Sequence, residues 1–289
     1  IIPWILAVAF VSRLFDTYRS LAIQQLAIPI LLGAGWGVAQ ILFGVSVKRL
    51  GLGIAYAIIV GLGAVLGTLV PLFVQQRVLA KEHALRLILS GVVVMSLGIF
   101  LTAWSGQIKE RAAAVHKSPS HRSYLAAIFL AVLCGLMAPM LNYSFAFGQD
   151  IAKAAVVFGN QPVHAAYAVW PVALAGGLVP NAAYSLWLLV KNQTWALFRA
   201  TPPDFLRSSL MGVLWMGAFA LYGMSATYLG ALGTSVGWGL LQIFMIMTAT
   251  IAGVLTGEWK HACRSARLLL GSGIAGLTVA IVLLASSSV

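Results

Sequence analysis

Charge is scarce in this sequence. Of its 289 residues only 8% are charged and six are acidic, whereas 61% are hydrophobic. A soluble domain carries roughly a quarter charged residues, so this chain has too few to cover a globule in water. The apolar runs are continuous rather than alternating, which favours helices over the strands of a membrane barrel. We therefore predict an all-α, polytopic membrane protein whose surroundings are the lipid bilayer.

Residues for metal, disulfide or catalytic chemistry are also few. Cys134 and Cys263 are the two cysteines, and no CxxC or Cys/His cluster accompanies them, which argues against a zinc site or a disulfide framework. No GxSxG, HExxH, P-loop or GxGxxG pattern stands in the context that its chemistry needs. We expect no enzymatic activity, no cofactor and no metal site.

Nine hydrophobic segments approach or reach the length of a membrane span, about 20 residues. They cover 1–11, 27–47, 52–74, 87–104, 124–147, 165–190, 209–229, 234–256 and 268–285. The first resembles the second half of a span. Two longer loops are expected at 105–123 and 191–208, and no soluble domain fits between the segments.

Basic residues are in excess, with 18 Lys and Arg and a net charge of +12. They lie in short loops rather than along a stripe with interleaved aromatic residues, which argues against nucleic acid as a partner. Cytoplasmic loops are rich in Lys and Arg. Loops numbered alternately put twelve basic residues on one side (Lys48, Arg49, Lys109, Arg111, Lys117, Arg122, Lys191, Arg199, Arg207, Lys260, Arg264, Arg267) and six on the other (Arg13, Arg19, Arg77, Lys81, Arg86, Lys153). The first side is predicted to be cytoplasmic and the C-terminus periplasmic, in a bacterial inner membrane.

An internal repeat appears when the chain is shifted by 179 residues. The pattern G-x-x-W-x-x-x-x-x-x-[FY]-G-x-S-x-x-x-L-G then occurs twice, with the matched pairs Gly33/Gly212, Trp36/Trp215, Phe43/Tyr222, Gly44/Gly223, Ser46/Ser225, Leu50/Leu229 and Gly51/Gly230. The two copies are five spans apart, and because five is odd they are predicted to cross the membrane in opposite directions. Such inverted repeats are common among secondary transporters.

The repeat divides the chain into two halves. The first inverted repeat is expected at 1–123 and the second at 124–289. The second half shows five spans and the first only four, so the intact protein is expected to have ten, with one and a half helices before Ile1.

The densest polar cluster attached to a span is APMLNYSFAFGQDIAKAA at 138–155. Pro139 can break the helix near a cavity, and polar groups at membrane depth usually face an interior space. Asn142, Tyr143 and Gln149 are candidates for substrate binding, although an ordinary helix end entering water explains them equally well. Asp150 is the candidate for proton coupling, with a solvated pair to Lys153 as the alternative.

Aromatic and amide residues elsewhere on the spans extend the candidate site. Aromatic rings pack on the apolar face of a sugar while amides bind its hydroxyl groups. The further substrate-binding candidates are Trp36, Gln40, Asn181, Tyr184, Trp215, Tyr222 and Gln242. Packing or interface aromatics are an equally good interpretation of Trp36 and Trp215. Small-residue pairs such as Gly33 and Gly37 indicate close helix packing, or a sliding surface for alternating access.

With these stretches in hand, the chain resembles the L-rhamnose–proton symporter family of the drug/metabolite transporter superfamily. The resemblance rests on 33–71, SGQIKER at 105–111, the polar segment 133–155 and GVLTGEWKHACRS at 253–265 with its Glu258-Trp259 pair. It implies a ten-helix carrier that imports a deoxy-sugar with a proton, and an amide role for Gln40. The chain departs from the family pattern at Gln149, where a basic residue is expected, and at Lys153, where an acid is expected.

The sequence thus favours a secondary transporter with a sugar and H+ as its small partners. A metabolite or drug exporter, or an exchanger, of the same superfamily is the alternative. A membrane sensor or scaffold is a third hypothesis, but no signalling domain is visible to support it. The oligomeric state and the exact substrate stay open.

Overall fold

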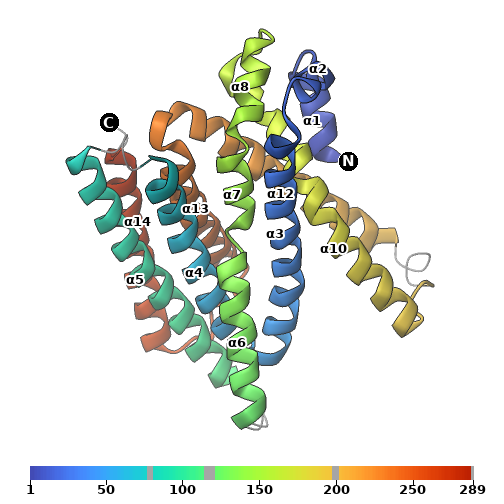
Figure 1. Ribbon diagram of the computed structural model, residues 1–289. Helices are drawn as coiled ribbons and strands as arrows, with labels where there is room; N and C mark the ends of the chain where they lie inside the picture. The colour runs from blue at the N-terminus through green and yellow to red at the C-terminus, as the bar shows by residue number, and fades with distance from the viewer. Residues whose placement is uncertain (77–80, 114–120, 197–201, 288–289) are drawn as a thin grey trace. The chain divides into compact units, whose positions relative to one another are not determined.

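The computed structural model describes residues 1–76, 81–113, 121–196 and 202–287, and within these ranges the chain is helical with no strand (Figure 1). The predicted all-α class is therefore confirmed. The helices in chain order are α1 Ile2–Phe10, α2 Leu14–Arg19, α3 Ile23–Leu50, α4 Leu52–Pro71, the π-helix η1 Leu72–Gln76, α5 Glu82–Ala113, α6 His121–Met137, α7 Met140–Phe147, α8 Gln149–Val157, α9 Pro162–Ala165, the 3-10 helix η2 Ala166–Ala168, α10 Val169–Asn192, α12 Pro202–Tyr228, the 3-10 helix η3 Gly230–Leu232, α13 Gly233–Leu255 and α14 Arg264–Ser286.

Eight stretches of the described residues are long and apolar enough to cross a membrane: Ile23–Leu50, Leu52–Gln75, Glu82–Lys109, Tyr124–Val157, Pro162–Asn192, Pro203–Tyr228, Gly230–Leu255 and Arg264–Ser286. They match eight of the nine predicted segments. The remaining segment, 1–11, forms the nine-residue helix α1, which is shorter than a span. The polytopic class holds.

The two long loops predicted at 105–123 and 191–208 are partly wrong. Helix α5 continues to Ala113, and α12 begins at Pro202. A span criterion stops where hydropathy falls, but the helix continues because Gln, Lys, Arg and Ala are good helix formers. Proline fits the first turn of a helix, so it starts α12 rather than ending it. Arg77, Lys117 and Arg199, which were counted for the orientation, lie outside the described residues.

Pro139 interrupts its span as predicted. Helix α6 ends at Met137, and α7 begins at Met140. Proline lacks the N–H that would continue the helical ladder and clashes with the preceding turn. Pro71 is the last residue of α4, ahead of the π-helical turn. Pro180, in contrast, lies within the uninterrupted helix α10. The break at 138–139 and a second one at Gly148 leave the polar segment on two short helices, α7 and α8.

The chain divides into two compact units. Unit 1 consists of Ile1–Ile41 and Met140–Tyr228, and unit 2 of Leu42–Pro139 and Leu229–Val289. Each unit draws residues from both halves of the sequence. The predicted boundary between the two repeats, at 123/124, comes from the sequence repeat. It does not coincide with the boundaries of these units and stays a prediction.

Unit 1 is built around a close approach of α3 and α10. A Cβ added to Gly33 would lie 1.8 Å from the carbonyl oxygen of Ala173, and one added to Gly176 would lie 1.9 Å from that of Ile30. Only glycine allows two helix backbones to come this near. The Gly33/Gly37 pair therefore allows close helix packing, which is the first of the two interpretations given for it.

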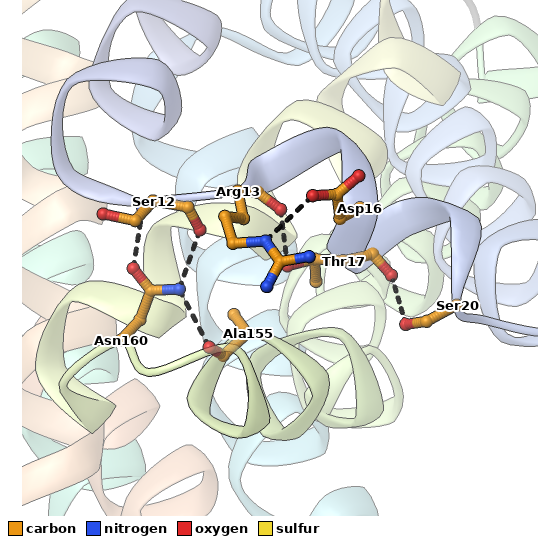
Figure 2. A network of polar contacts seen from close by, with 7 residues as sticks. All are labelled: Ser12, Arg13, Asp16, Thr17, Ser20, Ala155 and Asn160. Carbon is orange, nitrogen blue, oxygen red and sulfur yellow. Dashed lines mark hydrogen bonds and ion pairs between the residues drawn. The ribbon is translucent and has the colours of Figure 1, made fainter.

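A polar clasp joins two turns of unit 1 (Figure 2). Gly159, with φ of 91°, lies just beyond the end of α8, and Asn160 follows it. The Asn160 amide accepts a bond from Ser12 N–H at 2.7 Å and donates to the carbonyls of Ser12 and Ala155 at 2.9 and 2.8 Å. Because Asn160 is 8% exposed, these bonds satisfy polar groups that water hardly reaches. The clasp holds the α1–α2 turn against the end of α8.

Unit 2 packs α4, α5, α6, α13 and α14 together. Helix α5 runs along α14, with Ile88, Met95 and Leu277 fully buried between the helices of this unit. Trp238 donates its indole N–H to the carbonyl of Gly63 at 3.0 Å, against the small residue Gly67 of α4. These contacts give unit 2 its own apolar core.

Both copies of the repeat have the same local structure. Each copy is a long helix that ends at or just before the leucine of a Leu-Gly pair, and the two glycines take positive φ, 82° at Gly51 and 69° at Gly230. Glycine adopts this left-handed region without the strain that a Cβ would cause. The matched sequence positions thus correspond to matched backbone features.

Candidate functional site

Aromatic side chains of unit 1 form a connected row. The ring centroids of Trp36 on α3 and Trp215 on α12 are 5.5 Å apart with 22° between the planes. Trp215 contacts Phe219 at 4.4 Å, and Phe219 meets the edge of Trp170 at 5.5 Å. Trp170 stacks on Phe145 at 4.6 Å with 7° between the rings. The row runs from a partly exposed end at Trp36 to a buried end at Phe145.

A polar group stands at the buried end of this row. The hydroxyl of Tyr222 donates to the side-chain oxygen of Asn142, and the two residues are 3% and 0% exposed. Tyr222 also lies 5.4 Å from the Phe145 ring. A buried amide and phenol that bond each other avoid the cost of unpaired polar atoms. The segment after Pro139 therefore faces the interior of unit 1.

Trp170 adds a hydrogen-bond donor to this end. Its indole nitrogen is buried without a partner in the described part of the chain, and the side chain is 1% exposed. A Cβ added to Gly223 would lie 3.1 Å from that nitrogen. An unpaired buried donor is costly and marks a place where an acceptor would be stabilising.

Four predicted residues belong to this assembly: Trp36, Asn142, Trp215 and Tyr222. Gln149 is attached to it, because its side chain donates to the carbonyl of Phe145 at 3.0 Å. Tyr143, on α7, is half-buried. These residues come from three separate parts of the sequence, so only the fold brings them together.

Asp150 has the partners that the alternative interpretation named. Lys153 lies 3.0 Å from one carboxylate oxygen, and the Gln25 amide donates to the other at 3.3 Å. The side chains of Lys153 and Asp150 are 76% and 48% exposed. An ion pair this exposed is a weak interaction. The arrangement matches a solvated pair at the end of a helix.

The other predicted residues lie apart from the row. The Asn181 amide donates to the carbonyl of Gly177 in its own helix at 2.8 Å. Tyr184 stacks on Trp187 at 5.6 Å, next to Lys191. Gln40 is exposed on α3. Gln242 is buried on α13 in unit 2 and makes no part of the unit 1 assembly.

Sequence reasoning missed Phe145, Trp170 and Phe219. Phe219 follows Trp215 by four residues, a spacing that places both on one face of α12, so its signal was available. Trp170 and Phe145 carry no such signal. Their stacking depends on how α7 and α10 pack, and hydropathy along the chain does not encode that contact.

Eight candidate spans among the described residues define a polytopic membrane protein. Residues 1–288 match the model of one protein family, the L-rhamnose-proton symport protein RhaT. The chain belongs to this family. The resemblance seen in the sequence is confirmed. Membership of a symport family also confirms the prediction of a transporter rather than an enzyme.

Curated relatives carry the same description. The L-rhamnose-proton symporters of Escherichia coli strain SMS-3-5, Escherichia coli O45:K1 strain S88 and Escherichia coli O17:K52:H18 strain UMN026 are each 25% identical to the chain over 289 residues. The match covers 97% of this chain and 83% of each relative. No solved structure matches the chain.

Proposed function

We propose that the chain takes up L-rhamnose or a related sugar together with a proton, across a bacterial inner membrane. The observation that carries the proposal is the match of the symporter family along residues 1–288. The chemistry of unit 1 supports it, because indole rings suit the apolar face of a sugar ring and amide groups suit its hydroxyls. Trp36, Trp215, Asn142 and the donor of Trp170 are the residues we assign to sugar binding.

The exporter alternative is not favoured. The relatives named above are all described as symporters, and none as an exporter. The departures at Gln149 and Lys153 bear on which sugar is carried and on how the proton is coupled. They leave the class of transporter unchanged.

We further propose that transport proceeds by alternating access of two inverted repeats, 1–123 and 124–289, in a ten-span protein. The stacking of Trp36 on Trp215 supports this, since residues at equivalent positions of two symmetric halves meet only near the axis that relates them. The positive φ angles at Gly51 and Gly230 agree with equivalent helix ends.

Uptake by purified protein in liposomes tests the transport proposal. Labelled L-rhamnose should accumulate when the pH outside is lower than inside, and collapse of the gradient by a protonophore should abolish the accumulation. Facilitated equilibration without accumulation would remove the proton from the proposal. The absence of gradient-driven uptake for L-rhamnose and for a panel of related sugars would remove the function.

Trp36→Phe and Trp36→Ala test the aromatic platform. Phenylalanine keeps a ring and alanine does not, so the alanine variant should raise KM for the sugar more strongly. Loss of a stacking partner costs about 0.5–1.5 kcal/mol beyond its buried area, or roughly a 2- to 12-fold change in KM. Equal KM for both variants and the unchanged protein would exclude Trp36 from the site.

A further inference from the structure

Unit 2 contains a cavity that the unit 1 site does not use. Its volume is about 250 Å³, and its walls come from α4, α5, α13 and the turn after α13. The polar lining residues are Tyr56, Thr102, Lys109, Thr250, Glu258 and Trp259. Pockets for drug-sized ligands measure roughly 300–1,000 Å³, so this cavity suits a smaller molecule, such as one sugar ring.

The turn after α13 brings two of these residues to the cavity. Gly257 has φ of 84°, and the N–H groups of Glu258 and Gly257 bond back to the carbonyls of Gly253 and Val254 at 3.0 and 3.1 Å. This pair of bonds is the Schellman ending of a helix, which depends on a residue with positive φ. It reverses the chain, so that Glu258 and Trp259 return over the last turn of α13.

The polar wall offers donors and acceptors side by side. Lys109 on α5 lies 3.3 Å from a Glu258 carboxylate oxygen, and its ammonium stands 4.6 Å from the centroid of the Trp259 ring. The pair is close to neutral, so the wall does not select a charged ligand. A hydroxyl group can donate a hydrogen bond to the Glu258 carboxylate and accept one from the Lys109 ammonium at the same time.

The remaining lining residues suit the same ligand. The Tyr56 hydroxyl makes no hydrogen bond within the described ranges and is half-buried. Thr102 donates to carbonyls of its own helix, which leaves its oxygen able to accept. Trp259 supplies an indole face for the apolar side of a ring. Gly106 adds no side chain, and a Cβ there would meet nothing within 4 Å.

We propose that this cavity is a second sugar site, for a neutral, hydroxyl-rich molecule of monosaccharide size. The proposal rests on the proposed function, because L-rhamnose is the sugar that the site would hold. The turn that carries Glu258 belongs to the side predicted to be cytoplasmic. The cavity would then hold sugar on its way out of the carrier.

Substrate protection of an introduced thiol tests the site. In purified protein in lipid nanodiscs, Thr250→Cys places a thiol on the cavity wall, and peptide mass spectrometry follows its alkylation. At L-rhamnose about ten times its Kd, mass action leaves roughly a tenth of the sites free, so alkylation should slow about tenfold. Native Cys263 is exposed and outside the cavity, and its rate should not change.

A matched control separates occupancy from a general conformational response. Ala57 on α4 lines a neighbouring apolar cavity of about 350 Å³ with no charged wall. Ala57→Cys should show no protection, and protection equal to that of Thr250→Cys would overturn the second site. Ala249→Cys, on the same wall as Thr250, replaces that variant if it does not fold.

Glu258→Gln in the Thr250→Cys protein tests the polar wall. Glutamine keeps the shape but removes the carboxylate that would accept from a sugar hydroxyl, so protection should fall to less than half at the same sugar concentration. Full protection would exclude the ion pair from the site.

Uptake by the unchanged protein, measured beside the Thr250→Cys protection assay, separates the two proposals. Uptake of L-rhamnose without protection overturns the second site and leaves the transport function standing. Protection without uptake supports the site and removes the transport function. Neither uptake nor protection removes both.

Discussion

Trp36 and Trp215 occupy equivalent positions in the two copies of the repeat, and they stack on one another in unit 1. From that pair the aromatic row leads to a buried hydrogen bond between Tyr222 and Asn142. At the scale of residues, the candidate site is therefore an apolar surface with polar groups at its inner end. Asp150, in contrast, pairs with an exposed lysine, Lys153. The role predicted for it in proton coupling stays a prediction.

Tyr222→Phe should destabilise the protein. The change removes a buried hydroxyl from its bond to Asn142, and losing such a bond costs about 1–3 kcal/mol. The thermal unfolding midpoint in detergent should fall. Tyr143→Phe is the matched control, because the Tyr143 hydroxyl makes no hydrogen bond within the described residues. Equal midpoints for both variants would contradict a stabilising Tyr222–Asn142 bond.

Cys263 should react at a lower pH than a free cysteine. A hydrogen bond with the Ser265 hydroxyl, at 3.1 Å, lowers the pKa of the Cys263 thiol, and nearby backbone bonds lower it further. The thiolate is the nucleophile, so the rate of iodoacetamide alkylation should reach its half-maximum below the pH of about 8.5 typical of free cysteine. Ser265→Ala should move that pH upward. An unchanged profile would exclude the hydrogen bond as the cause.

At the scale of elements, glycines decide how near two helices can lie. Gly33 and Gly176 let the backbones of α3 and α10 meet, whereas a Cβ at Gly212, the repeat partner of Gly33, would meet nothing within 4 Å. The two positions hold the same residue in the repeat, but only Gly33 is packed closely against another helix. The broken helix around Pro139 is a second local feature that shapes the interior. After it, the polar residues Asn142 and Ser144 of α7 are buried.

Gly33→Ala should therefore be far more harmful than Gly212→Ala. The added methyl at position 33 would overlap the carbonyl oxygen of Ala173, and overpacking of this kind costs about 1–3 kcal/mol or more. Gly212→Ala should be neutral or slightly stabilising, since alanine is the better helix former. Yield of folded protein and the unfolding midpoint measure both. Similar losses from the two variants would contradict the close α3–α10 approach.

At the scale of the whole molecule, each compact unit draws helices from both halves of the sequence. Unit 2 pairs α4 with α13 and α5 with α14. The repeat relates those same helices, at an offset of 179 residues. Equivalent helices of the two halves therefore pack against each other within one unit. We take this pairing of helices as support for the proposed inverted repeat.

Accessibility to an impermeant maleimide tests the orientation. Arg49→Cys, in the last turn of the first repeat helix α3, and native Cys263 should be labelled only in inverted vesicles. Ala231→Cys, after the second repeat helix, should be labelled only in right-side-out cells, in a Cys263→Ser background. All these positions are exposed. Labelling of Arg49→Cys and Ala231→Cys from one and the same side would exclude the inverted repeat.

The membrane class, eight of the spans, the repeat and the family were available from the sequence alone. Each depends on local or periodic information: mean hydropathy over a span, the turn preference of Pro139, or matched residues at a constant offset. The tertiary structure alone decided which side chains meet. It joined Trp170 and Phe145 to the row, paired Asn142 with Tyr222, and left Asn181 and Tyr184 outside it. Apolar helices in lipid look alike in hydropathy, and the choice of contacting faces depends on packing between segments far apart in the chain.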